Sequence, residues 1–78
     1  MTQDYMIYIH TNDKEYTEHW YGLVDVSNRL LSIQDCNNIN YIDLVDALTG
    51  EVLISIEYGK VVEVSTTYIV KFYEEIGC

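Results

Sequence analysis

The sequence predicts a small α+β protein built from a three-stranded antiparallel meander, two helices and an N-terminal strand or hairpin. β-branched and aromatic residues are abundant while alanine occurs once, a composition that suits pleated, half-buried strands. Apolar residues alternate at every second position in the middle of the chain, but recur at spacings of three and four in two other segments. The 78 residues leave room for one compact acidic domain, 1–78. The alternative architecture is a small all-β barrel.

The N-terminal segment, residues 5–19, is expected to form a strand or a hairpin. Residues 5–11 alternate between two faces, a polar turn follows at 12–14, and residues 15–19 are able to return as a second strand. One face carries Tyr5, Ile7 and Ile9, and the other carries Met6, Tyr8 and His10.

Residues 20–34 are expected to form an amphipathic helix, because the apolar period changes from two to three or four at Trp20. Asp25 or Ser27 is the expected N-cap if the helix begins late, and the polar run 35–38 stops it. The expected buried stripe is Trp20, Leu23, Ser27, Leu30 and Gln34, flanked by Val26 and Ile33.

Residues 39–65 are expected to form the meander. Three-residue loops at 48–50 and 58–60 keep apolar residues opposite apolar ones, and Gly50 then occupies the loop position that needs a positive φ. This register sets Asp43 opposite Ser55, and Ser55 opposite Glu63. The helices are expected to cover the face that carries Ile42, Leu44, Val52, Ile54, Ile56, Val62 and Val64.

Residues 67–76 are expected to form a short C-terminal helix. A Ser or Thr before Tyr68 suits its N-cap, Gly77 suits its C-terminal end, and Glu74 with Glu75 is expected on a solvated face. A further strand is the rival interpretation, since residues 67–73 are rich in strand formers. The expected packing stripe is Ile69, Phe72, Tyr73 and Ile76.

The net charge of −9 is the most informative bulk property. Only Lys14, Arg29, Lys60 and Lys71 are cationic, so neutralisation of nucleic-acid phosphates or of an anionic membrane does not drive binding. A basic protein partner is favoured instead. The chain contains no apolar run that would span a membrane and no signal-peptide pattern, and its two cysteines suit free thiols, so a cytoplasmic location is expected.

No catalytic, metal-binding or cofactor-binding residues are expected. His10 and His19 are nine residues apart and the two cysteines are 42 apart, spacings that make no zinc motif. Asp43 and Asp46 fall on opposite faces of a strand, so they do not converge as an acid–base pair. The sequence has no phosphate-binding loop and no nucleophile motif, and an enzyme is therefore not expected.

The uncovered face of the predicted sheet is the candidate protein-binding surface. A solvated polar face is the ordinary interpretation of such a surface, but apolar residues ringed by acids are typical of interaction sites. The candidate residues are Tyr41, Asp43, Leu53, Glu57, Val61 and Glu63.

These features favour a small non-enzymatic inhibitor that occupies the basic, nucleic-acid-binding surface of a partner, with carboxylates imitating phosphates as in a DNA mimic. Proteins of this size, charge and tyrosine content occur among phage and mobile-element anti-defence proteins, such as anti-CRISPR and anti-restriction inhibitors. The likeness is one of character, and no motif identifies such a family. The alternative is a structural or regulatory adaptor that uses a sheet edge or the Leu53 and Val61 patch, with a homodimer compatible with that edge.

Overall fold

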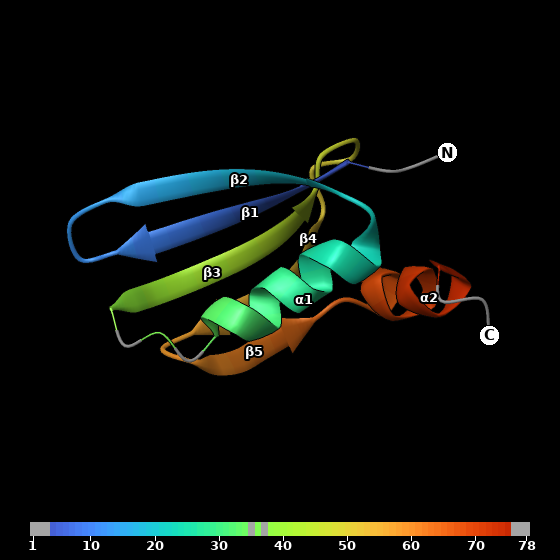
Figure 1. Ribbon diagram of the computed structural model, residues 1–78. Coiled ribbons are helices and arrows are strands. Elements are labelled where there is room, and N and C mark those ends of the chain that lie inside the picture. The colour runs from blue at the N-terminus through green and yellow to red at the C-terminus, as the bar shows by residue number, and fades with distance from the viewer. Residues whose placement is uncertain (1–3, 35, 37, 76–78) are drawn as a thin grey trace.

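The computed structural model describes residues 4–34, 36 and 38–75, which form five strands and two helices (Figure 1). The elements, in chain order, are β1 (Asp4–Thr11), β2 (Glu15–Tyr21), α1 (Leu23–Ile33), β3 (Ile39–Asp46), β4 (Val52–Glu57), β5 (Lys60–Val64) and α2 (Thr66–Glu75).

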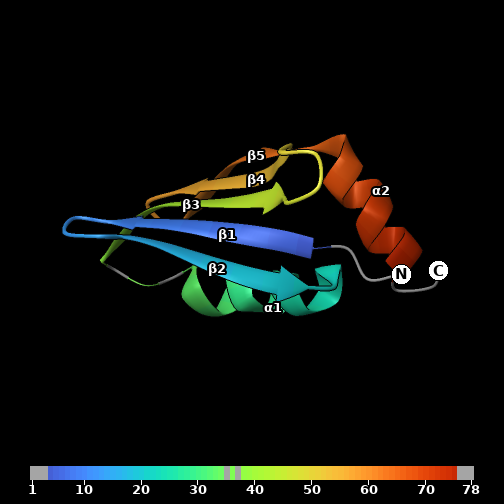
Figure 2. The same ribbon diagram turned by 90° about the horizontal axis from the view of Figure 1, so that it is seen from above.

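The strands form one antiparallel sheet in the order β2-β1-β3-β4-β5. Helix α1 lies along one face of this sheet, and α2 lies beyond the sheet's end, beside the start of α1 (Figures 1 and 2). The α+β class is confirmed. Over the described residues the sheet is open, with β2 and β5 as its unjoined edges, so the closed barrel is not seen.

The N-terminal hairpin is longer than expected, and α1 is correspondingly shorter. Trp20 pairs with Tyr5 as the next-to-last residue of β2, so the helix predicted from residue 20 begins only at Leu23. Gly22 occupies the N-cap position with φ 86°, a conformation that glycine adopts without strain, and neither Asp25 nor Ser27 is the cap. The buried stripe of α1 is Leu23, Val26, Ser27, Leu30 and Ile33.

The core lies between α1 and the sheet. It forms because the alternating strands β1, β3 and β4 each turn their apolar side chains toward the helix. Its strand members are Tyr5, Ile7, Ile9, Ile42, Leu44, Leu53, Ile54 and Ile56, and Trp20, Ile39, Tyr68 and Phe72 pack around them.

The β3–β4 register is confirmed where Asp43 faces Ser55, but the predicted three-residue loop is wrong. The Asp46 amide donates to the Glu51 carbonyl at 2.9 Å, which leaves a four-residue loop, 47–50. A bulge in β4 compensates for the added residue and makes Leu53 the extra one. Gly50 has the expected positive φ, 78°.

The β4–β5 loop, by contrast, is shorter than predicted. Glu57 faces Lys60, so the turn is Tyr58-Gly59, with positive φ at both residues as a two-residue hairpin turn requires. A bulge then brings Ser55 opposite Glu63, as expected, but sets Val61 opposite Ile56.

Residues 66–75 form a helix, not the rival strand, and the Ser65 hydroxyl caps it by accepting the Thr67 amide at 3.1 Å. The predicted stripe is largely wrong, because Ile69 and Tyr73 are exposed while Tyr68 and Phe72 face the core. Ile76 and Gly77 lie outside the described residues. Val52, Val62 and Val64 are exposed, so the prediction that they are buried is wrong. The β4 bulge turns Val52 to the face opposite α1, and α1 does not cover β5, which carries Val62 and Val64.

Candidate functional site

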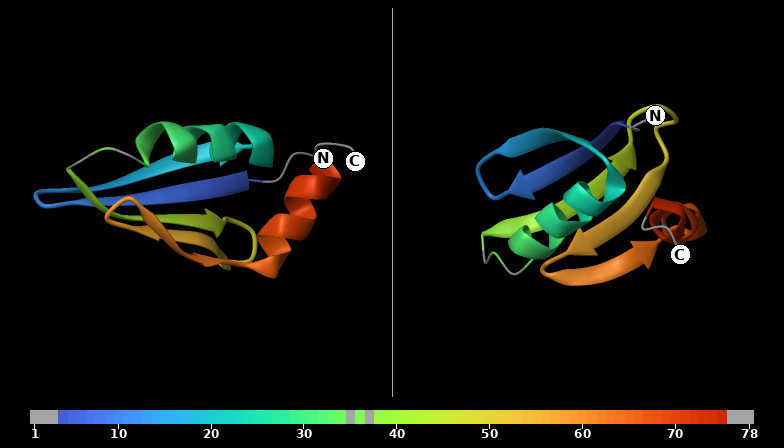
Figure 3. Two further views of the ribbon diagram at one scale, coloured as in Figure 1. Left: turned by 90° about the horizontal axis from the view of Figure 1, so that it is seen from below. Right: turned by 45° about the vertical axis from the view of Figure 1, so that its right-hand side comes forward.

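The sheet face opposite α1 is the candidate site, because the described chain lays neither helix across it (Figures 2 and 3). Strand register arranges its side chains in rows that cross the sheet, since directly paired residues share a face. We call this surface the open face. One row contains Thr17, Tyr8, Asp43, Ser55 and Glu63, and the next contains Glu15, His10, Tyr41, Glu57 and Lys60.

Asp43 is the fixed carboxylate at the centre of the open face. It is half-buried, and the Ser55 hydroxyl donates to its Oδ1 at 2.9 Å from the neighbouring strand. Tyr8 lies opposite Asp43 on the other side, and its hydroxyl contacts the Met6 sulfur at 3.7 Å. The central acid is therefore held by the sheet and is not on a freely rotating side chain.

An aromatic pair borders these acids. The rings of Tyr41 and Tyr58 lie 5.5 Å apart and their hydroxyls 3.5 Å apart, while His10 meets the Tyr41 ring edge-on at 6.3 Å. The hydrogen bond with Tyr58 raises the pKa of Tyr41, and the charge of Glu57 adds to this, so Tyr41 stays neutral at physiological pH. The pair offers flat apolar surface beside the Glu57 carboxylate.

Four of the six predicted site residues lie together on the open face: Tyr41, Asp43, Glu57 and Glu63. Leu53 does not, because the β4 bulge turns it into the core, where it is 1% exposed. Val61 is exposed, but its pairing with Ile56 places it on the α1 side of the sheet. The expected apolar patch of Leu53 and Val61 is therefore wrong, and Met6, Val45 and Val52 are the apolar residues of this face.

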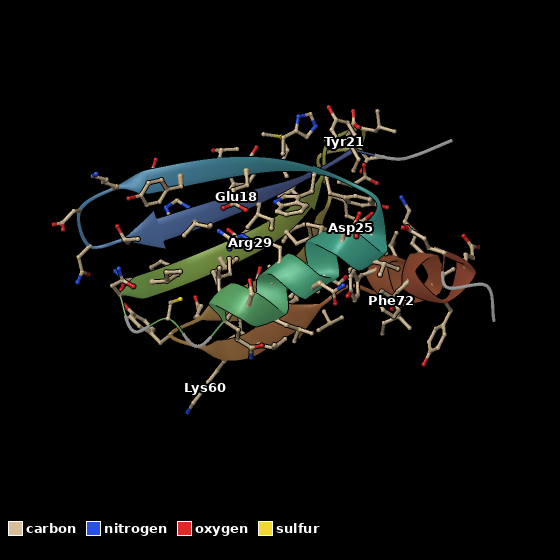
Figure 4. The ribbon with its side chains drawn as sticks, viewed as in Figure 1. Glu18, Tyr21, Asp25, Arg29, Lys60 and Phe72 are labelled. Carbon is tan, nitrogen blue, oxygen red and sulfur yellow. The ribbon has the colours of Figure 1, made fainter. Side chains whose placement is uncertain are left out.

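Arg29 does not neutralise the acids of the open face, because it is paired with Glu18 on the α1 side of the sheet (Figure 4). Its guanidinium bonds both Glu18 oxygens, at 2.9 and 2.6 Å, and the Trp20 indole N–H donates to the same carboxylate at 2.9 Å. These hydrogen bonds, that from Arg29 foremost, lower the pKa of Glu18. The bidentate pair fixes β2 against α1.

Lys71 is likewise engaged away from the open face. Its ammonium lies 2.7 Å from Asp46 Oδ2, and Asp46 is 1% exposed. Burial acts to raise the pKa of Asp46, but the hydrogen bonds from Lys71 and from the Leu48 and Thr49 amides outweigh it and leave the pKa lowered. The pair links α2 to the end of β3 inside the protein.

Glu75 has a role that its sequence position does not indicate. Its carboxylate accepts the Leu23 amide at 2.7 Å and the Val24 amide at 3.3 Å, so α2 caps the N-terminus of α1. Glu75 is exposed, as expected of a solvated helix face, but the prediction did not include its contact with α1. No local spacing reveals this contact, because its two ends are 52 residues apart.

A cavity of about 810 Å³ lies between the β1–β2 hairpin and the C-terminal part of α1. Its lining mixes Ile9, Ile33 and Ile39 with polar groups, and the Arg29 that borders it is already paired with Glu18. The described residues contain no group of three or more His, Cys, Asp or Glu side chains placed to hold a metal ion. The cavity therefore indicates no particular ligand chemistry.

Comparisons with protein-family models, with curated proteins and with solved structures found no match for this chain. Within the part of the chain that the structure describes, neither helix has the length and apolar character needed to cross a membrane.

Proposed function

We propose that this protein is a non-enzymatic inhibitor whose open face occupies a basic, nucleic-acid-binding surface of a partner protein. The observation that carries the proposal is the alignment of Asp43, Glu57 and Glu63 on one sheet face while Arg29 and Lys71 are paired elsewhere. The negative field of this face is therefore opposed by few cations, of which Lys60 is the one that the strand register places there.

The rigidity of the surface favours recognition over nonspecific attraction. Strands pair about 4.8 Å apart, so Asp43 and Glu63, two strands apart, have backbones about 10 Å apart. This spacing is set by the sheet and does not depend on side-chain rotamers. A basic channel that binds phosphates would meet carboxylates that the sheet holds at fixed points of attachment, with Asp43 anchored by Ser55, and steering by opposite charge would speed the encounter.

The Tyr41–Tyr58 pair supplies the remaining part of a protein-binding surface. Interface centres are enriched in tyrosine, and arginine side chains stack on aromatic rings. An arginine of the partner that lies over these rings also meets Glu57, which faces Tyr41 across β3 and β4. The partner proposed here is thus rich in arginine and binds nucleic acid, and the inhibitor is of the anti-defence kind made by phages and mobile elements.

The test compares two variants of equal charge. Asp43→Asn/Glu57→Gln/Glu63→Gln neutralises the open face, while Asp13→Asn/Asp25→Asn/Glu74→Gln neutralises three exposed acids elsewhere. Each immobilised protein is offered a panel of purified basic nucleases and DNA-binding proteins, with and without duplex DNA as competitor, across a salt series. We expect a partner that the wild type and the control retain, that DNA displaces, that high salt releases, and that the open-face variant loses.

Equal loss of binding in both variants would mean that binding depends on net charge and not on the position of the acids. That result would contradict the proposal. So would a partner whose retention is unchanged by salt or by DNA, because a surface that imitates phosphates competes with them by definition.

The adaptor hypothesis remains a second candidate, supported by the free edge at β5 and not by the Leu53 patch. An adaptor of that kind tolerates neutralisation of Asp43, Glu57 and Glu63 but is sensitive to changes in β5. The same panel therefore separates the two functions if a β5 variant is included.

A further inference from the structure

Strand β5 is an outer edge of the sheet, and its whole length is solvent-exposed (Figures 1 and 3). An edge strand presents unpaired backbone groups along one side, which makes it a template for another strand. The described chain lays no further strand or helix along this edge.

The side chains of β5 are unusual for a solvated edge. Val61, Val62 and Val64 are 44–54% exposed, because α1 covers only the middle of the sheet. The opposite edge, β2, differs, since its residues on the α1 side include Trp20 packed against the core and Glu18 paired with Arg29. The β5 valines thus form the apolar edge that is left without cover.

Two charged residues of β5 complement each other in one particular register. Lys60 faces Glu57 and Glu63 faces Ser55 within the chain, so both lie on the open face. Figure 4 shows Lys60 extending away from the body of the protein. In an antiparallel pair related by a two-fold axis, a register that sets Lys60 opposite Glu63 makes that contact twice, and it brings Val61 opposite Val62 between the two contacts.

We propose that β5 pairs with β5 of a second copy in this antiparallel register, which joins the two sheets into one of ten strands. Cross-strand Lys–Glu contacts favour the register, and valines are strong formers of such pairs. The contact is isologous and closes at two copies, leaving both open faces exposed on one side of the extended sheet.

Salt separates this proposal from the proposed function. Each copy carries −9, so long-range repulsion opposes dimerisation at low ionic strength and is screened as salt is added. Dimerisation is therefore expected to strengthen from low to physiological salt, whereas binding of the open face to a basic partner weakens. Dimerisation does not depend on the existence of that partner, and the failure of one proposal leaves the other standing.

The test is a charge swap read out by sedimentation equilibrium over a concentration series at low and physiological salt. The wild type is expected to approach roughly twice its monomer mass of 9.1 kDa at high concentration. Lys60→Glu and Glu63→Lys each create two like-charge contacts and are expected to weaken the dimer roughly tenfold. The double variant Lys60→Glu/Glu63→Lys restores both contacts and is expected to return to the wild-type value.

Lys14→Glu and Asp13→Lys are the matched controls, because they make the same charge changes in the exposed β1–β2 turn near the opposite edge of the sheet. Circular dichroism establishes that each variant is folded. A wild type that stays monomeric at every salt and concentration would overturn the proposal. So would single variants that match their controls, a double variant that does not recover, or a mass that grows beyond two copies.

Discussion

Asp46 shows how far a residue's surroundings, rather than its type, decide what it does. In the sequence it is one of 13 acids. In the structure it is almost wholly buried, accepts the Leu48 amide at 2.9 Å and bonds the Lys71 ammonium at 2.7 Å. A buried carboxylate without such partners is costly, so the Asp46–Lys71 pair makes the docking of α2 specific.

Lys71→Met is expected to lower the free energy of unfolding by about 3 kcal/mol, because it leaves Asp46 buried without its counter-ion. Urea denaturation followed by circular dichroism measures the change. Lys14→Met, at an exposed turn position, serves as the control and is expected to stay within about 0.5 kcal/mol of the wild type. A Lys71→Met protein as stable as this control would show that the pair contributes nothing.

Glu18 gives a pH dependence of defined sign. Its hydrogen bond to Arg29 lowers its pKa in the folded protein, so the unfolded chain takes up the proton first as the pH falls. The stabilisation from Glu18 is therefore complete above about pH 5 and is lost as the pH falls through and below the ordinary glutamate pKa of about 4.3.

Glu18→Gln removes this dependence, so the stability difference between wild type and variant is expected to shrink from pH 7 to pH 3. Denaturant titrations at intervals of one pH unit provide the measurement. A difference that stays constant over this range would mean that charge on Glu18 plays no part.

At the scale of elements, the docking of α2 supplies the N-terminal cap that α1 lacks. The N-cap of α1 is Gly22, which has no side chain to accept the first amides of the helix, and the Glu75 carboxylate accepts them instead. A Cβ at residue 22 would lie 3.3 Å from Glu75 Oε1, so glycine leaves room for the carboxylate as well as adopting the positive φ. The Ser27–Tyr68 hydrogen bond, 2.7 Å long, joins the same two helices one turn further along.

Glu75→Ala is expected to destabilise the protein by about 1 kcal/mol, the usual cost of losing an N-cap. It is also expected to speed hydrogen exchange at the Leu23 and Val24 amides. Glu74→Ala is the matched control on the same helix. Unchanged exchange at both amides in Glu75→Ala would contradict the capping role.

The sequence predicts the strands and helices well, but it predicts the loops, bulges and helix-packing faces poorly. Alternation identifies β1, β3 and β4 because each has one face against the core, and a one-residue slip would expose that face. The bulges that decide which face Leu53 and Val61 occupy leave no pattern in the sequence, because they arise from the length and backbone angles of the neighbouring turns. The α2 stripe fails for a related reason, since this helix packs at the end of the sheet and buries few side chains.

At the scale of the whole molecule, the structure shows where the acids behind the net charge of −9 lie. The structure pairs Glu18 and Asp46 with two of the four cations and leaves acids on the open face. The grouping of Asp43, Glu57 and Glu63 follows from strand period and was predictable. The joining of β1 and β2 to the meander, which adds Tyr8, His10 and Glu15 to that face, depends on long-range pairing that a single sequence does not specify.

Carboxylates grouped on one face are expected to cost stability rather than provide it. Asp43 and Glu57 are diagonal neighbours across β3 and β4, where like charges repel at about 7–8 Å. The variant Asp43→Asn/Glu57→Gln/Glu63→Gln removes this repulsion, and Asn at 43 still accepts the Ser55 hydroxyl. We expect its free energy of unfolding at low salt to equal that of the wild type or exceed it by up to about 1 kcal/mol.

This gain is expected to shrink when salt screens the charges, which urea denaturation at low and at high ionic strength measures. A loss of stability greater than about 1 kcal/mol, independent of salt, would instead mean that the acids hold the sheet together. In that case their alignment would need no partner to explain it. A stable variant that has lost its partner would separate the two roles, because the surface would then serve binding at no benefit to the fold.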